Sequence, residues 1–499
     1  MRSGTAERRA RVRLAGLGAV LAIALAACGS QVPHSTIVAA NGPLVGTEVG
    51  AAGGAVGTGS AGDGGFGAAT GTSGASAGSA ASSGSDGSGS GSGDGSGSAS
   101  GDGSGSGAAP GSQSSGGVVG SSTAATPGAA GGAGGAAPAP TGSTIVLGNI
   151  GSYSGVLGAV FPGGPAGILA WAQEVNAQGG IDGHPVKVVS GDDGGDPSVA
   201  LTLAKQMVQG DGAIALVGSM VPLSLSGIEP YLDQEHIPLI GGDVTLPNWI
   251  QDPDIFPQGT DVTSISVGAV RLITAGGHNK LAILYCGESP SCKGLADGAE
   301  ASPPAGVQIV YTAEISIVQT DFTTECLQAK NDGATAIFVA ADANSVIRVG
   351  MSCSQQDYHP RYGTASIAVG PQLASDPEMN GLIAPVNNAP WFLSNTPATQ
   401  EFANAMATYE PGAPLAATAM SMFASGELVQ AAGAHLGPHP TAAGLIAGLD
   451  SLRGVTLGGL APPLSFSPGQ GSGAIPCYFV VEVSNGQWTA PDGATPQCP

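Results

Sequence analysis

The sequence predicts an α/β protein with two doubly wound parallel-sheet lobes, preceded by a disordered tether. Glycine accounts for 85 of the 499 residues, far above the roughly 7% of ordinary proteins, and long glycine- and serine-rich tracts precede Thr144. From Thr144 onwards, short apolar runs alternate with helical patterns in two successive sets of similar size. This alternation is typical of parallel sheets covered by helices on both faces. The roughly 355 residues after position 143 are enough for two ordinary domains.

Residues 1–27 have the pattern of a signal peptide. Five arginines form a cationic start, and residues 14–27 are an apolar run too short for a stable membrane anchor. The run ends in Leu25-Ala26-Ala27-Cys28-Gly29, which resembles a bacterial lipobox. The resemblance implies that Cys28 is diacylated and becomes the mature N-terminus, so that a lipoprotein is anchored to the outer face of the cell membrane. The alternative is an ordinary signal peptide followed by a chance cysteine.

Residues 28–143 are predicted to be the tether. Phe66 is their only aromatic residue, so the segment has too little apolar surface to offset the entropy of ordering. About 100 residues of such a chain have a root-mean-square span of roughly 50–60 Å, enough to lift a domain clear of lipid headgroups.

The charge balance excludes nucleic acid as a partner. The chain has 14 Lys and Arg against 36 Asp and Glu, a formal net charge of −22. Nucleic-acid binding requires a basic stripe that displaces counterions from phosphates, and the sequence contains none.

The first α/β set begins with an apolar run and a glycine-rich loop at 151–164. A helix follows, with Ile168, Ala172 and Val175 on one face and Gly179-Gly180 at its end. After the acidic loop 192–196, Asp196 is placed to cap a helix that has Pro197 at its first position. A further helical stretch ends near residue 234. We expect strands at 144–150, 186–189, 213–217 and 237–240.

The second set begins after Thr260. We expect strands at 281–285, 307–311 and 335–340, and helices at 264–275, 292–301, 322–330 and 345–356. Ligands of open α/β sheets bind beyond the carboxyl ends of the strands, so two such lobes facing each other would form a binding cleft.

Several motifs occur in the order and spacing of a known family. Ser154-Gly155 follows the first strand, Trp171 to Gly183 reads WAQEVNAQGGIDG, and Asp192 to Pro197 reads DDGGDP. The later motifs are Ile237-Pro238-Leu239-Ile240, Thr245, Gly381-Leu382 and Pro463-Leu464-Ser465-Phe466.

Residues 144–499 thus resemble the type I periplasmic solute-binding proteins of ABC importers, specifically the branched-chain amino-acid (Leu/Ile/Val) receptor branch. The resemblance implies a monomeric receptor without a cofactor, which captures an amino acid, amide or organic acid by cleft closure and delivers it to an importer permease.

The resemblance also implies that the chain crosses between the lobes three times. We place the crossings near 259–262, 385–388 and 465–468, where the connecting strands would form the hinge. Lobe one would then comprise 144–260 plus 386–465, and lobe two 261–385 plus 466–499.

In this family, hydroxyls and backbone amides of two loops in lobe one hold the carboxylate of the ligand. The matching loops here are 219–224 and 241–245, and the positions carried over are Ser154, Gly155, Ser219, Ser224 and Thr245. Pro222 occupies the usual hydroxyl position of the first loop and can donate no hydrogen bond. Asp243 brings an acid where a small residue is usual, and it is a candidate partner for a ligand ammonium.

Lobe two departs further from the family pattern. Ala365 aligns with the acidic partner of the ligand ammonium, and Ser291 aligns near an aromatic that packs on the ligand. Asp342 is the nearest acid that could replace the missing partner, and it could equally cap the following helix. The acids of the 192–196 loop are better explained as helix caps than as a metal site, because they lack the ligand spacing of an EF-hand.

Six cysteines remain after Cys28, which allows 15 pairings in a secreted chain. Proximity in the sequence favours Cys286–Cys292, Cys326–Cys353 and Cys477–Cys498. The rival is a metal site, which the absence of a CxxC pair disfavours.

Two other classes of function are an enzyme and a ligand-sensing module. An enzyme is disfavoured because the folded region has no Walker loop, no HExxH motif and no serine elbow, and Tyr153 stands where an elbow needs its serine. A ligand-sensing module remains the alternative, and it would signal through a separate membrane partner.

Overall fold

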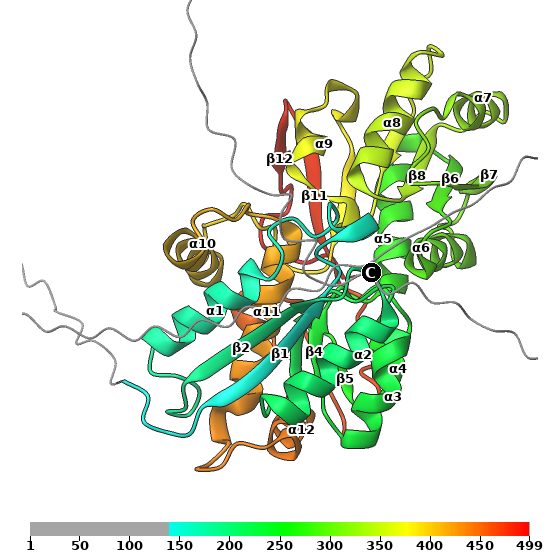
Figure 1. Cartoon of the computed structure of the whole chain (residues 1–499). Coiled ribbons are helices and arrows are strands. Elements are labelled where there is room, and N and C mark those ends of the chain that lie inside the picture. Colours follow the sequence, from blue (N-terminus) through cyan, green and yellow to red (C-terminus); the bar gives the residue numbers. More distant parts are fainter. Residues whose placement is uncertain (1–138, 499) are drawn as a thin grey trace, which may run out of the picture. The chain divides into compact units, whose positions relative to one another are not determined.

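The computed structural model describes residues 139–498 (Figure 1). The predicted signal peptide, Cys28 and the tether up to residue 138 lie outside the described residues. Within the described part, no helix is long and apolar enough to cross a membrane. No group of three or more His, Cys, Asp or Glu side chains within residues 139–498 is arranged to hold a metal ion.

The first sheet contains five parallel strands in the order β2-β1-β3-β4-β5. The strand order reverses beside β1, which lies between β2 and β3, and such a switch point places a crevice at the carboxyl ends of the strands. The strands are β1 Ile145–Gly151, β2 Val186–Asp192, β3 Leu216–Ser219, β4 Leu239–Gly242 and β5 Ile255–Phe256.

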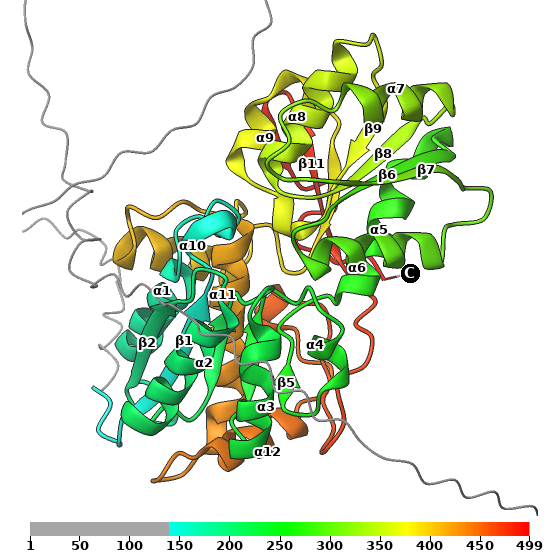
Figure 2. The same ribbon diagram turned by 45° about the vertical axis from the view of Figure 1, so that its right-hand side comes forward.

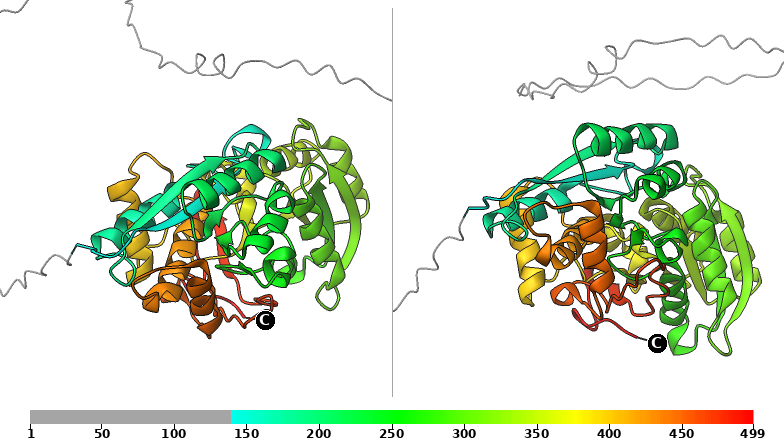
Figure 3. Two further views of the ribbon diagram at one scale, coloured as in Figure 1. Left: turned by 60° about the horizontal axis from the view of Figure 1, so that its bottom comes forward. Right: turned by 90° about the horizontal axis from the view of Figure 1, so that it is seen from below.

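Helices cover both faces of this sheet. Its N-terminal helices are α1 Ala166–Ala177, α2 Pro197–Lys205, α3 Leu225–Glu235 and the short α4 Asn248–Gln251. From later in the chain, helices α10 Pro397–Tyr409 and α11 Ala417–Ala432 contact α1, and α12 Ala442–Ser451 packs on α11. Figure 3 shows these later segments in orange on the same side of the molecule as the cyan strand of the first lobe. Helix α11 packs closely on α1 because a Cβ at Gly426 would lie 2.0 Å from the indole Cδ2 of the buried Trp171. Only glycine permits this approach.

The second sheet has seven strands in the order β12-β11-β10-β9-β8-β6-β7. Strands β6 to β10 are parallel, and β11 and β12 add an antiparallel hairpin at one edge. The strands are β6 Lys280–Cys286, β7 Gln308–Ile315, β8 Ala336–Ala340, β9 Arg361–Gly363, β10 Ile383–Val386, β11 Phe479–Ser484 and β12 Gln487–Thr489.

Two apolar clusters flank the second sheet, one on each face. Helices cover both faces of this sheet (Figure 2). Helices α5 Val262–Thr274 and α6 Pro290–Ala301 pack on one face. Helices α7 Thr323–Asn331, α8 Ala343–Ser354 and α9 Pro371–Ser375 pack on the other. Both lobes are therefore doubly wound, as the sequence predicts.

Three chain segments connect the lobes and are held together by hydrogen bonds. The Thr260 amide donates to the Asn387 carbonyl at 3.3 Å, and the Thr260 hydroxyl donates to the Cys477 carbonyl at 2.6 Å. The third segment lies later along the chain than the expected 465–468, because Gly473 still bonds Ile250 of α4. These three segments form the predicted three-stranded connection.

Three disulfides lie in the second lobe or at its edge: Cys286–Cys292, Cys326–Cys353 and Cys477–Cys498. They are the pairs that proximity in the sequence predicts.

Candidate functional site

Two adjoining pockets lie where the carboxyl ends of strands from both lobes meet. Loops after β1, β3 and β4 contribute from the first lobe, and loops after β6, β7 and β8 contribute from the second. The ring of Phe161, in the glycine-rich loop after β1, lines both pockets. This is the position that the fold favours for a ligand.

The hinge-side pocket lies at Asn387 and Asn388, beside the segments that connect the lobes. Its apolar wall includes Phe161, Met220 and Trp391, and the side chains of Asn387 and Thr418 add polar groups. Within residues 139–498, the buried Thr418 hydroxyl has no hydrogen-bond partner.

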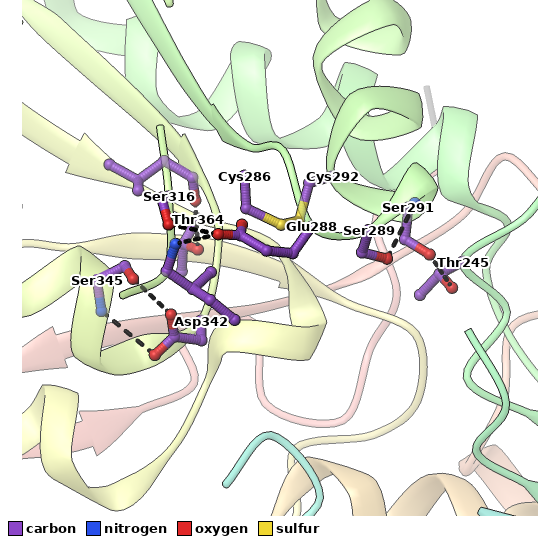
Figure 4. The surroundings of a disulfide bond; sticks show 12 residues. Thr245, Cys286, Glu288, Ser289, Ser291, Cys292, Ser316, Asp342, Ser345 and Thr364 are labelled. Atoms are coloured by element: carbon purple, nitrogen blue, oxygen red, sulfur yellow. Dashed lines mark hydrogen bonds between the residues drawn. A yellow bond between two sulfur atoms is a disulfide. The ribbon is translucent and has the colours of Figure 1, made fainter. Parts of the chain in front are cut away.

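The outer pocket is mainly apolar. Leu157, Val160, Pro222 and Ile317 line it together with the Cys286–Cys292 disulfide. Its polar edge, part of which Figure 4 shows, consists of Thr245, Glu288, Ser289, Ser291 and Asp342.

Asp243 is buried at the junction of the two first-lobe loops. Its Oδ2 accepts a hydrogen bond from the Val221 amide at 2.9 Å, and its Oδ1 accepts from the Thr245 amide at 3.0 Å and from the Thr245 hydroxyl at 2.5 Å. Burial raises the pKa of Asp243, and the bonds from Thr245 and Val221 oppose that rise. The carboxyl group thus uses two backbone donors and one hydroxyl donor at the carboxyl edge of the sheet.

The backbone between Asp243 and Thr245 is strained. Val244 has a φ of 50°, an outlier for a β-branched residue, and it is buried. This conformation allows the residues on either side of Val244 to meet in a tight turn. Backbone strain of about 1–3 kcal/mol is characteristic of functional loops.

Thr245 also joins the two lobes. Its hydroxyl lies 2.8 Å from the Ser291 hydroxyl at the start of α6 (Figure 4). A hydroxyl has one proton, and that of Thr245 is directed to Asp243, so Ser291 is the donor in this contact.

The acids of the second lobe have structural partners. Glu288 accepts from the Ser316 hydroxyl at 2.5 Å and the Ile317 amide at 3.1 Å. Desolvation acts to raise the pKa of Glu288, but these hydrogen bonds outweigh it and leave the pKa below its ordinary value. Asp342 caps α8 through the amides of Asn344 and Ser345, and it still lines the outer pocket. Both alternatives considered for Asp342 therefore remain compatible with its position.

Only some of the predicted ligand-binding residues meet at the pockets. Asp243, Thr245 and Asp342 line them, whereas Ser154 and Gly155 lie exposed at the start of the 3-10 helix Gly155–Leu157. Ser219 is buried at the end of β3, where its hydroxyl accepts from the Ile150 amide, and Ser224 is buried before α3. The pockets are also lined by residues that are not among the predicted ligand-binding residues: Leu157, Phe161, Glu288, Ser291 and Trp391.

The acidic loop after β2 supports the loop that carries Phe161. Asp192 accepts from the amides of Tyr153 and Ser154, and Asp193 accepts from the Ser152 hydroxyl at 2.8 Å. Asp196 caps α2 as predicted. Asp192 and Asp193 therefore hold a loop in place rather than cap a helix.

Among the described residues that line the two pockets, the only ionisable side chains are carboxylates. Asp243, Glu288 and Asp342 contribute them, and no Lys, Arg or His side chain is among the described residues that line either pocket. The lining therefore offers no cation to pair with an anionic ligand.

Two doubly wound lobes, three connecting segments and a pocket between the lobes define a solute-binding receptor fold. The chain belongs to the periplasmic binding protein family, whose sequence profile matches residues 144–487. This family serves ABC transporters for amino acids and other ligands.

Individual relatives are distant. An amino acid binding protein of Pseudomonas aeruginosa is 25% identical over 198 residues, which cover 39% of this chain and 53% of that protein. The match thus spans about half the length of this relative.

Solved structures share the fold. A branched-chain amino acid ABC transporter protein of Thermus thermophilus with bound valine has a TM-score of 0.62 at 15% identity, covering 71% of this chain and 97% of its own. A fatty acid ABC transporter substrate-binding protein of Thermomonospora curvata has a TM-score of 0.61 at 18% identity, covering 72% and 95%.

Proposed function

We propose that this protein is an extracytoplasmic lipoprotein receptor that captures a small solute by closure of its two lobes and delivers it to an ABC importer. The observation that carries the proposal is the pair of pockets between the lobes, where Thr245 of one lobe contacts Ser291 of the other. A solute held there touches both lobes, so its binding favours the closed form over the open one. Closure is the change that an importer could recognise.

The hinge of this motion would be the three connecting segments. Thr260, Asn387 and Cys477 lie side by side and exchange hydrogen bonds, so they would rotate together while each lobe stays rigid. We place the lobe boundaries at these residues, with lobe one built on β1 to β5 and α10 to α12, and lobe two on β6 to β12.

The solute would be small and largely apolar. Phe161, Trp391 and Met220 offer apolar surface, and the Thr418 hydroxyl offers a free polar group. The anchor would be the diacylated Cys28, which the lipobox-like sequence before it predicts. No catalytic step is part of the proposal.

Native mass spectrometry of the protein purified from its own host tests the proposal. The expected result is one small molecule per chain, released on unfolding, that raises the melting temperature when it is added back. A small-molecule extract of the host in which no fraction raises the melting temperature would contradict it.

A further inference from the structure

The most informative group in the pockets is a carboxylate that belongs to the protein. Asp243 is only 6% exposed, and it lies where the loops after β3 and β4 meet at the ligand-facing edge of the first sheet. Three donors from these two loops converge on it: the Val221 amide, the Thr245 amide and the Thr245 hydroxyl.

Such a set of donors forms an anion site. Two backbone N–H groups and a hydroxyl directed at one carboxylate stabilise its ionised form, because charge-assisted hydrogen bonds are stronger than neutral ones. In this protein the Asp243 carboxyl already occupies these donors, and they oppose the rise in its pKa that burial causes. Pro222, which follows Val221 in the sequence, lines the outer pocket and has no backbone N–H to donate.

The remaining polar groups do not compensate. The Ser291 hydroxyl donates to Thr245, and the acids Glu288 and Asp342 face the outer pocket without a lining cation among the described residues. The Thr418 hydroxyl adds only a neutral donor in the hinge-side pocket. A buried anionic ligand without a counter-charge is strongly disfavoured.

We infer that Asp243 fills the anion site of the cleft from within, and that the solute is a small, largely apolar molecule without a carboxylate, whose polar end is cationic or an uncharged hydrogen-bonding group. This inference rests on the proposed solute-binding function and narrows the class of solute.

The first arm of the test empties the anion site. Asp243→Ala removes the carboxylate and leaves three donors around a space that fits formate, whereas Asp243→Asn keeps the space filled with a neutral amide. Formate should raise the melting temperature of Asp243→Ala in a saturable manner, at matched ionic strength, and should leave the wild type and Asp243→Asn unchanged. An equal response of all three proteins, or no response of Asp243→Ala, would overturn the inference.

The second arm needs only the wild type and so does not depend on the folding of a variant. Isopentylamine and isovalerate share a branched five-carbon skeleton and carry opposite charges. Calorimetry should show the amine binding at least tenfold more tightly than isovalerate or leucine. Binding of isovalerate or leucine as tight as that of the amine would overturn the inference. If calorimetry detects binding of neither isopentylamine nor isovalerate, the formate experiment with the Asp243 variants decides.

Different results would overturn the receptor function and the inferred class of solute. A carboxylate recovered from the cleft of the native protein would overturn this inference and leave the solute receptor standing. A host extract without any stabilising fraction would remove the receptor function, while the formate arm would still report on the anion site.

Discussion

The hydroxyl of Thr245 lies 2.8 Å from the hydroxyl of Ser291, and this hydrogen bond joins a loop of the first lobe to the start of α6 in the second. The two residues are 46 positions apart in the sequence. Since the contact requires the two lobes to lie together, it stabilises the closed arrangement.

Ser291→Ala should therefore weaken solute binding without unfolding the protein. One hydrogen bond contributes about 1 kcal/mol, so calorimetry with the native solute should show an affinity loss of roughly fivefold. Ser198→Ala, on the exposed first turn of α2, is the matched control and should bind as the wild type does. Equal affinities of the two variants would argue against a closing role for the contact.

The Cys286–Cys292 bridge should affect binding as well as stability. It lines the outer pocket, and it closes a short loop, with a sequence separation of 6, that carries Glu288 and Ser289. In the chain-entropy model its removal by a double Cys→Ser exchange costs about 2.4 kcal/mol. The freed loop should also lower the affinity for the solute.

Cys326–Cys353 provides the control for that experiment. It joins α7 to α8, has a sequence separation of 27 and lines neither pocket. Its removal should lower stability by roughly 3.5 kcal/mol and leave affinity unchanged. A loss of affinity of the same size in both double variants would show that Cys286–Cys292 affects solute binding no more than a bridge outside the pockets does.

Glu427 should make the protein less stable as the pH rises. Burial, together with the nearby charge of Glu401, raises the pKa of Glu427 from 4.5 to about 7. The native state therefore holds this proton more tightly than the unfolded state, and the resulting stability is complete below about pH 4.5 and is lost as the pH rises through 7. The loss is at most about 3 kcal/mol.

Urea unfolding at pH 5 and pH 8 measures this effect. Glu427→Gln should match the wild type at pH 5 and exceed it at pH 8, whereas the exposed Glu235→Gln should change neither value. A stability difference between Glu427→Gln and the wild type that is the same at both pH values would rule out titration of Glu427 as the cause.

The predicted lipid anchor is tested at Cys28. Cys28→Ser should move the protein from the membrane fraction into the medium, and mass spectrometry of the wild type should find the diacyl group on its N-terminal peptide. Retention of Cys28→Ser in membranes, with no lipid on the wild-type peptide, would contradict the anchor.

Local patterns were sufficient to predict most of the central strands and helices. Strand β6 and helix α8 lie within two residues of their predicted ranges, because their apolar spacing is regular and their ends carry strong signals such as the Asp342 cap. The two-residue β5, the short β9 and β10 and the hairpin of β11 and β12 have no predicted counterpart, because short strands depend on partners distant in sequence. Helices α10, α11 and α12 have no predicted counterpart either.

The binding site was less predictable for the same reason. The sequence marked Asp243 as an unusual acid, but nothing near it shows that its carboxylate bonds Val221, 22 positions earlier. Ser219 and Ser224 have hydroxyls of the expected kind, yet β3 and α3 bury both. Which face of a loop meets the cleft is decided by tertiary packing, and local composition does not encode it.

The central claim is that the two lobes close on a solute, and small-angle X-ray scattering with and without the native solute tests it most directly. Rotation about the segments at Thr260, Asn387 and Cys477 should lower the radius of gyration of the protein at saturating solute. Scattering curves that superimpose with and without saturating solute would contradict the claim.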